Sequence, residues 1–285
     1  MDFESPLTDS EKNTLRKWQE LQVSILKNFH KFMEFHKLSY WMDAGTVLGA
    51  YRHQGFVPWD DDIDLAMFQE DFFRLKNMIL SDPNLGKDFN LSFYSDRFGI
   101  DQQYIGLASL PLLYNNEGIA VFTIDIYCAG RYRMKNLASW SKVERYSVFC
   151  NPRYLSLRKF YSDFGSLTRK ERVKYIFNLK PFEFRTALLV IWILPLILSL
   201  LRSPNGRLVE YHHLSRFSFN SAVDVSAVLP LQKIPFEGHM FYGPANLLKY
   251  NQALFGEKHL EYPPIENRKP CHFDIQQIEK WIQTG

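Results

Sequence analysis

The 285-residue chain has few of the features that define disulfide-rich or secreted proteins. Cysteine is scarce: Cys128, Cys150 and Cys271 are odd in number and lack the paired spacing of a disulfide framework, which favours a reducing compartment. The first residues, Met1 to Glu4, are acidic and contain no apolar core of a secretory signal. We therefore expect a cytoplasmic protein.

Strong net charge, internal repeats and low-complexity tracts are also missing. The net charge is only +3, so bulk charge gives no support for a nucleic-acid partner, and we expect none. At 46% hydrophobic residues the chain is typical of a folded protein with one large or two small domains.

The chain also lacks an apolar run long enough for a spanning helix. The uncharged stretch 186–201 falls short of the ~20 residues required, and Pro195 interrupts it. It lies in a segment, 130–204, where Lys and Arg far outnumber Asp and Glu. Two interpretations remain open: a peripheral or monotopic anchor at an anionic membrane surface, or a buried helix of a helical insertion.

Acidic residues, by contrast, are concentrated at one point. Asp60, Asp61, Asp62 and Asp64 immediately precede or interrupt the apolar run 63–67. If that run is a strand, Asp62 and Asp64 project from the same face while Ile63 and Leu65 enter the core. Paired carboxylates at the mouth of a sheet favour Mg²⁺ or Mn²⁺, and the alternative is a solvated acidic turn.

A candidate phosphate site precedes the acidic stretch. Residues 41–46 predict a short strand that breaks at a glycine, followed by a short helix over 47–52. A helix that opens at Gly45 and Thr46 would present free N–H groups to an anion. Arg52 and His53 follow on that helix, and we expect these four residues to bind phosphate.

The stretch from Asp43 to Asp64 (DAGTVLGAYRHQGFVPWDDDID) resembles the signature of the LicD family, which includes the fukutin-related proteins. A second resemblance lies near the end of the chain, in Phe236-Glu237-Gly238, Pro244, Tyr250, Phe255-Gly256 and 262–268. The resemblance implies an α/β (α+β) nucleotidyltransferase-like fold, a small mixed sheet flanked by helices. We expect a catalytic core over 1–130, a basic helical insertion over 131–215, and the rest of the catalytic domain over 216–285.

The same resemblance implies the chemistry. A phosphorylated alcohol, of the phosphocholine or pentitol-phosphate type, would pass from a CDP-activated donor to a hydroxyl of a glycan or lipid-linked glycan. Asp62 and Asp64 would hold the metal, Asp60 could share it, and Asp61 should face away. The family pattern places a third carboxylate on a neighbouring strand, and Asp125, alone in the apolar run 121–127, matches it. Asp125 would complete the metal shell or act as general base; the alternative is a strand-end Asp that caps a turn.

Two other functions compete with this one. A nucleotidyltransferase that makes a CDP-alcohol from CTP would release pyrophosphate rather than CMP. A non-catalytic, membrane-associated scaffold of the same fold would not need three carboxylates held together.

Local patterns predict several other elements. The capping box at Thr8 to Glu11 starts a helix that we expect to end near Lys37, and residues 69–80 form another. We further expect strands over 91–94, 104–110, 121–127 and 225–231, and helices over 244–255 and 276–281.

The membrane interpretation gives a first prediction. The protein should sediment with anionic vesicles at low salt, because each basic residue near the surface contributes about 1 kcal/mol. Raising the salt concentration should weaken this attachment without abolishing it, and deleting residues 186–201 should release the protein. Protein that stays in the supernatant at low salt would instead make the apolar run part of the core.

Overall fold

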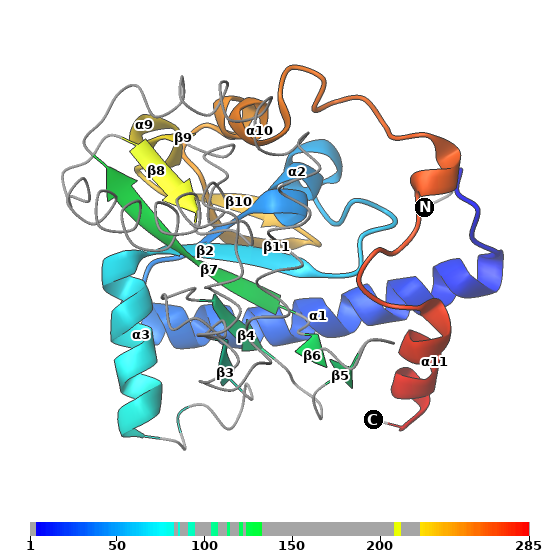
Figure 1. Ribbon diagram of the computed structural model, residues 1–285, viewed down its shortest axis with the longest axis horizontal. Helices are drawn as coiled ribbons and strands as arrows, with labels where there is room; N and C mark the ends of the chain where they lie inside the picture. Colours follow the sequence, from blue (N-terminus) through cyan, green and yellow to red (C-terminus); the bar gives the residue numbers. More distant parts are fainter. Residues whose placement is uncertain are drawn as a thin grey trace, which may run out of the picture.

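A mixed sheet flanked by helices forms the body of the protein (Figure 1). The computed structural model describes residues 4–82, 85, 91–94, 104–107, 113–114, 120–121, 124–132, 208–211 and 223–284. The main path of the sheet has the order β1 (Trp41–Met42), β2 (Ile63–Phe68), β7 (Ile124–Tyr132), β4 (Tyr104–Leu107), β3 (Leu91–Tyr94). β8 (Leu208–Tyr211) also pairs with β7, and β9 (Val223–Asp224) pairs with β8. The predicted α+β class is confirmed.

The central pair of strands, β2 and β7, runs parallel, whereas the other pairs in this sheet are antiparallel. Every residue of β2 is buried, because helices cover the sheet. This explains why the sequence after Asp62 is almost continuously apolar. The parallel register sets Asp64 directly beside Asp125.

The long helix α1 (Asp9–Phe35) crosses the molecule along one face of the sheet (Figure 1). The Thr8 hydroxyl accepts from the Glu11 N–H, and the Glu11 carboxylate accepts from the Thr8 N–H, so the predicted capping box is confirmed. Leu26, Phe29 and Met33 on its second half are fully buried in the main core. Trp18 on its first half packs with Phe273, Ile275 and Ile278 at the end of the chain.

Shorter elements complete the body. They are α2 (Ala44–His53), α3 (Gln69–Ser81), β5 (Leu113–Tyr114), β6 (Ala120–Val121), α9 (Val225–Val228), β10 (Gln232–Phe236), β11 (His239–Gly243), α10 (Leu247–Phe255), the 3₁₀ helix η3 (Ile265–Asn267) and α11 (Ile275–Thr284). β5 pairs with β6 and β10 with β11 as separate two-stranded sheets. The β10–β11 hairpin packs against α1: the rings of His30 and Phe241 are 5.5 Å apart, and Lys233 Nζ lies 2.7 Å from Glu34 Oε1.

One predicted strand is wrong. Residues 225–228 of the expected strand over 225–231 form helix α9, because the Asp224 side chain accepts a hydrogen bond from the Ser226 N–H and caps that turn. The valines suggested a strand, but the cap and the packing of Ala227 and Val228 into the core determine a helix.

The predicted insertion, 131–215, lies mostly outside the described residues. Its two ends are strands: β7 continues to Tyr132, and β8 returns at Leu208 to pair with it. None of the described helices is long and apolar enough to cross a bilayer. The apolar run 186–201 is outside the described residues, so its role stays a prediction.

The tight packing of α2 gives a second prediction. A Cβ on Gly49 would overlap the carbonyl oxygen of Gly55 and lie 2.7 Å from the backbone nitrogen of Val57. Gly49→Ala should therefore lower the free energy of unfolding by roughly 1–3 kcal/mol, the usual range for overpacking. In the matched variant Gly243→Ala the new methyl group meets only the movable Ile234 side chain, so urea denaturation should show a smaller loss. Equal losses would contradict this account of the α2 contact.

Candidate active site

Four aspartates lie close to one another near the amino-terminal ends of the central strands β2 and β7. Asp62 immediately precedes β2 and Asp64 lies in it, while Asp125 sits beside Asp64 on β7. Asp43 directly follows β1, and its N–H donates to the Asp64 carbonyl over 2.9 Å. From the sequence, Asp62, Asp64 and Asp125 were predicted to belong to the site, but Asp43 was not. Asp43 is the first residue of the family-like stretch and follows the short apolar strand β1.

Burial and mutual repulsion dominate the electrostatics of these four aspartates. Burial raises the pKa of Asp43 to about 7, that of Asp62 to about 6 and that of Asp125 to about 8. The pKa of Asp64 is also raised well above its ordinary value, first by burial and then by the negative charge of Asp62 and Asp125. The charges of Asp62, Asp125 and Asp43 therefore oppose ionisation of Asp64, and the charge of Asp62 opposes ionisation of Asp125.

The hydrogen bonds available to these carboxylates leave some oxygens unpartnered. The Tyr250 hydroxyl donates to Asp43 Oδ1 over 2.8 Å, and the Tyr127 hydroxyl donates to Asp125 Oδ2 over 3.3 Å. Asp43 Oδ2 and Asp125 Oδ1 are buried and accept no hydrogen bond. Within the described part of the chain, no Lys or Arg forms an ion pair with any of the four, whereas His272 Nδ1 lies 3.4 Å from Asp62 Oδ2. Carboxylate oxygens are the ligands that a hard divalent cation such as Mg²⁺ prefers. In the described part of the chain, the group of three carboxylates with oxygens within 4.8 Å of one another is that of Asp60, Asp61 and Asp62, so of the predicted metal ligands only Asp60 and Asp62 belong to this close group.

The start of α2 lies against this cluster. A Cβ on Gly45 would come within 2.5 Å of Asp60 Oδ2, so only glycine allows the Asp60 carboxylate to approach the helix there. The Thr46 hydroxyl is buried and accepts from the Asp64 N–H over 2.8 Å, which fixes α2 to β2. Gly45 and Thr46 lie in the first helical turn, where backbone N–H groups have no intrahelical acceptor. The prediction that an anion binds here therefore depends on the backbone N–H groups of Gly45 and Thr46. The Thr46 side chain instead joins α2 to β2.

The structure does not bring Arg52 and His53 to that end of the helix. They lie in the last turn of α2, roughly 10 Å along the axis from Gly45. Arg52 Nη2 donates to the Glu261 carbonyl over 2.7 Å, and its guanidinium lies 5.0 Å from the centre of the Tyr262 ring. His53 stacks on the same ring. These contacts hold the segment after α10, so a phosphate-binding role for Arg52 and His53 remains a prediction.

Asp61 turns towards the end of the chain. Its carboxylate accepts from the N–H groups of Cys271, His272 and Phe273 at 3.3, 3.0 and 2.7 Å. The sequence predicted that Asp61 faces away from the metal ligands. Its carboxylate does point towards residues 271–273, where it is fully buried. Its oxygens also stay within 4.8 Å of those of Asp60 and Asp62.

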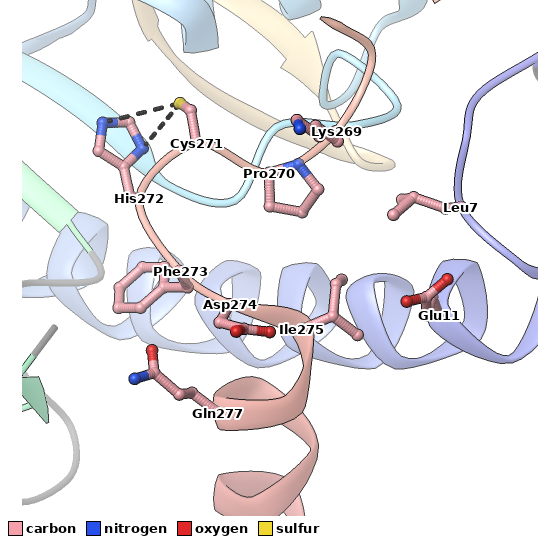
Figure 2. A pocket seen from close by; sticks show the side chains of 10 residues that line it. All are labelled: Leu7, Glu11, Lys269, Pro270, Cys271, His272, Phe273, Asp274, Ile275 and Gln277. Atoms are coloured by element: carbon pink, nitrogen blue, oxygen red, sulfur yellow. Dashed lines mark hydrogen bonds between the residues drawn. The ribbon is translucent and has the colours of Figure 1, made fainter. Parts of the chain in front are cut away.

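His272 is the residue that sequence reasoning did not place. Its Nδ1 lies 3.1 Å from Asp61 Oδ1 and 3.4 Å from Asp62 Oδ2. The hydrogen bond to Asp61, followed by that to Cys271, raises the pKa of His272 to about 12. From the sequence, His272 was one of three residues near the second family-like segment, with His239 and Arg268, that could approach the site. Cys271 and His272 are adjacent in sequence. Figure 2 shows this pair on the segment that leads into α11.

Part of the chain is similar in sequence to known proteins. Residues 37–107 match the family described as LicD/FKTN/FKRP, nucleotidyltransferase domain. The chain is 38% identical over 95 residues to the lipopolysaccharide cholinephosphotransferase LicD of Haemophilus influenzae, covering 33% of this chain and 34% of that protein. It is 44% identical over 39 residues to the human ribitol 5-phosphate transferase FKRP, covering 14% of this chain and 8% of that one. The chain thus spans about a third of the first relative's length and under a tenth of the second's.

The raised pKa values give a third prediction. With metal removed, the folded protein should retain protons on Asp43, Asp62 and Asp125 that the unfolded chain loses near pH 4. Stability should therefore fall as pH rises from about 4 to about 8, by up to about 1.4 kcal/mol per pH unit for each such carboxylate. Asp125→Asn should reduce this slope, and Mg²⁺ should restore stability at pH 8. Urea denaturation in chelator and in Mg²⁺ measures both effects, and a flat profile in chelator would contradict the electrostatic account.

Proposed function

We propose that this chain, whose residues 37–107 match the LicD/FKTN/FKRP nucleotidyltransferase domain, transfers a phosphorylated alcohol to a glycan hydroxyl. The donor would be a CDP-activated alcohol of the phosphocholine or pentitol-phosphate type, and the acceptor a glycan or lipid-linked glycan. The observation that supports this most is the group of buried carboxylates from three adjacent strands, with oxygens left unpartnered.

Asp62 and Asp64 would hold the metal, with Asp43 and Asp60 beside it, and Asp125 would remain available to accept the proton of the acceptor. When bound there, Mg²⁺ or Mn²⁺ supplies charge neutralisation for the donor diphosphate and the departing nucleotide. Tyr250 and Tyr127 orient the carboxylates of Asp43 and Asp125. The fully buried indole of Trp41, which donates to the Tyr250 hydroxyl over 2.8 Å, supports Tyr250 in turn.

In the transfer, the acceptor oxygen forms a bond to the donor phosphorus while the bond from that phosphorus to the CMP oxygen breaks. The acceptor proton must leave as this happens. Asp125 is our candidate for the base, because its buried Oδ1 has no partner and its raised pKa makes it more basic than an ordinary carboxylate. The backbone N–H groups at Gly45 would face the donor phosphate, beside Asp60.

The competing functions are supported less well. The relatives whose printed names state an activity are transferases of phosphocholine or ribitol phosphate, which favours transfer over synthesis of a CDP-alcohol. A scaffold without turnover would gain nothing from mutually repelling buried carboxylates, since their burial costs stability.

The fourth prediction tests this function. Asp62→Asn and Asp64→Asn should each reduce turnover by more than about 10²-fold, the scale for loss of one electrostatic group at a transition state. The matched control is Asp9→Asn, at the exposed start of α1, which should keep full activity. Mass spectrometry after incubation with a panel of CDP-alcohols, Mg²⁺ and glycan acceptors identifies the products.

Three outcomes would contradict the proposal in different ways. Near-normal turnover in a folded Asp62→Asn or Asp64→Asn variant would remove these residues from the site. Pyrophosphate released from CTP and a phosphoalcohol would identify the synthesis of a CDP-alcohol instead. No turnover by the wild-type protein with any donor of the panel would favour the scaffold.

A further inference from the structure

Three side chains of different chemistry meet where residues 271–273 pack against residues 60–62, the acidic loop before β2. His272 Nδ1 lies 3.1 Å from Asp61 Oδ1 and 3.3 Å from Cys271 Sγ, and Cys271 Sγ lies 3.9 Å from Asp61 Oδ1. With metal bonds of about 2.0–2.3 Å, neighbouring ligands of a tetrahedral zinc site are about 3.3–3.6 Å apart. The three atoms therefore lie near the corners of one tetrahedral face.

The one hydrogen that His272 Nδ1 can carry has several acceptors around it. A ring nitrogen carries at most one hydrogen, yet His272 Nδ1 faces Asp61 Oδ1, Asp62 Oδ2 and Cys271 Sγ, all within 3.4 Å. The thiol hydrogen can add one further bond at most. A divalent cation in contact with the nitrogen, the sulfur and the carboxylate oxygen would satisfy all of them together.

We propose that Asp61, Cys271 and His272 form a second metal site, selective for Zn²⁺, that clamps residues 271–273 to the acidic loop. Thiolate and imidazole ligands favour Zn²⁺ over Mg²⁺, whereas the cluster of Asp43, Asp62, Asp64 and Asp125 offers only oxygen. The two sites thus differ in ligand softness although Asp61 and Asp62 are adjacent in sequence. This proposal does not depend on the reaction proposed above.

The protein holds the ligands of this site in place before any metal binds. The Asp61 carbonyl accepts from Trp18 Nε1 over 2.8 Å and from Gln22 Nε2 over 2.7 Å, so α1 fixes the backbone of the acidic loop. On the other side, Phe273 is buried with its ring edge against Trp18, at 5.3 Å between centroids. Ordering the site therefore costs little conformational entropy.

The site is also accessible. Cys271 is exposed, and the His272 side chain keeps 45% of its surface open. Both residues line a cavity of about 530 Å³ between the start of α1 and the segment before α11 (Figure 2). A metal ion can enter from this side, with the thiol proton lost to solvent, and water or Asp62 Oδ2 can supply a fourth ligand.

The test uses the full chain, stripped with chelator and dialysed against micromolar ZnCl₂ in excess MgCl₂. Elemental analysis should then find one zinc per chain. Cobalt substitution should give a thiolate-to-cobalt charge-transfer band in the near ultraviolet. Cys271→Ser should abolish that band, and both Cys271→Ser and His272→Gln should raise the Kd for zinc by at least about 100-fold.

Two controls make the result specific. Cys128→Ser removes a buried thiol on β7 and should leave zinc binding unchanged. Asp64→Asn should retain zinc even if turnover is lost, which separates this site from the proposed transferase chemistry.

Three results would overturn the proposal. One is wild-type protein that keeps no zinc and gives no charge-transfer band, a measurement that does not depend on any variant folding. Another is zinc binding that survives Cys271→Ser and His272→Gln. The third is a loss of activity in these variants without any zinc in the wild type, which would make the group a hydrogen-bonded latch.

Discussion

The repulsion among buried carboxylates is the constraint on which the rest of this structure depends. Asp62, Asp64 and Asp125 are adjacent because β2 and β7 run parallel in a register that pairs Asp64 with Asp125. Asp43 joins them because β1 pairs antiparallel with β2 and ends one residue before it. Elementary electrostatics opposes this arrangement, so the surrounding packing must hold it.

That packing comes from large side chains on both faces of the sheet. Phe29 and Met33 of α1, Phe72 of α3 and Tyr250 of α10 are all fully buried in the same core. Apolar burial of this kind stabilises a fold by roughly 1.5–3 kcal/mol per large side chain. The charges of the site oppose folding, and the burial of the apolar core favours folding. This combination is expected where function and stability conflict.

Local sequence signals predicted the elements that depend only on neighbours in the chain. The capping box located the start of α1, and apolar periodicity located β2 and α3 to within a residue or two. The same reasoning failed for 225–231, where β-branched residues outweighed the capping side chain of Asp224. Propensity is a weak guide when a segment is short and a single cap decides its conformation.

Contacts between distant segments could not be predicted in this way. Nothing near Arg52 in sequence indicates that its guanidinium contacts Glu261 and Tyr262. Nothing near Asp61 indicates that its carboxylate accepts hydrogen bonds from residues 271–273. Asp43 was missed for a similar reason. A carboxylate before a helix predicts a cap, yet the Asp43 side chain makes no capping bond and accepts from Tyr250 instead.

These distant contacts explain why the two family-like stretches occur in one chain. Glu237 accepts from the Phe56 N–H and from Arg16, which fixes the approach to the acidic loop. Tyr250 supports Asp43, and Arg268 lies over Trp59 at 5.7 Å, one residue before Asp60.

Each of these residues of the second stretch therefore contacts the first stretch or the helix that supports it. The carboxylates of the first stretch are placed by their strands, and contacts from the second stretch support Asp43 and the residues that flank Asp60. A change at Glu237, Tyr250 or Arg268 should consequently act on the site through Asp43 or the acidic loop, without any contact with substrate.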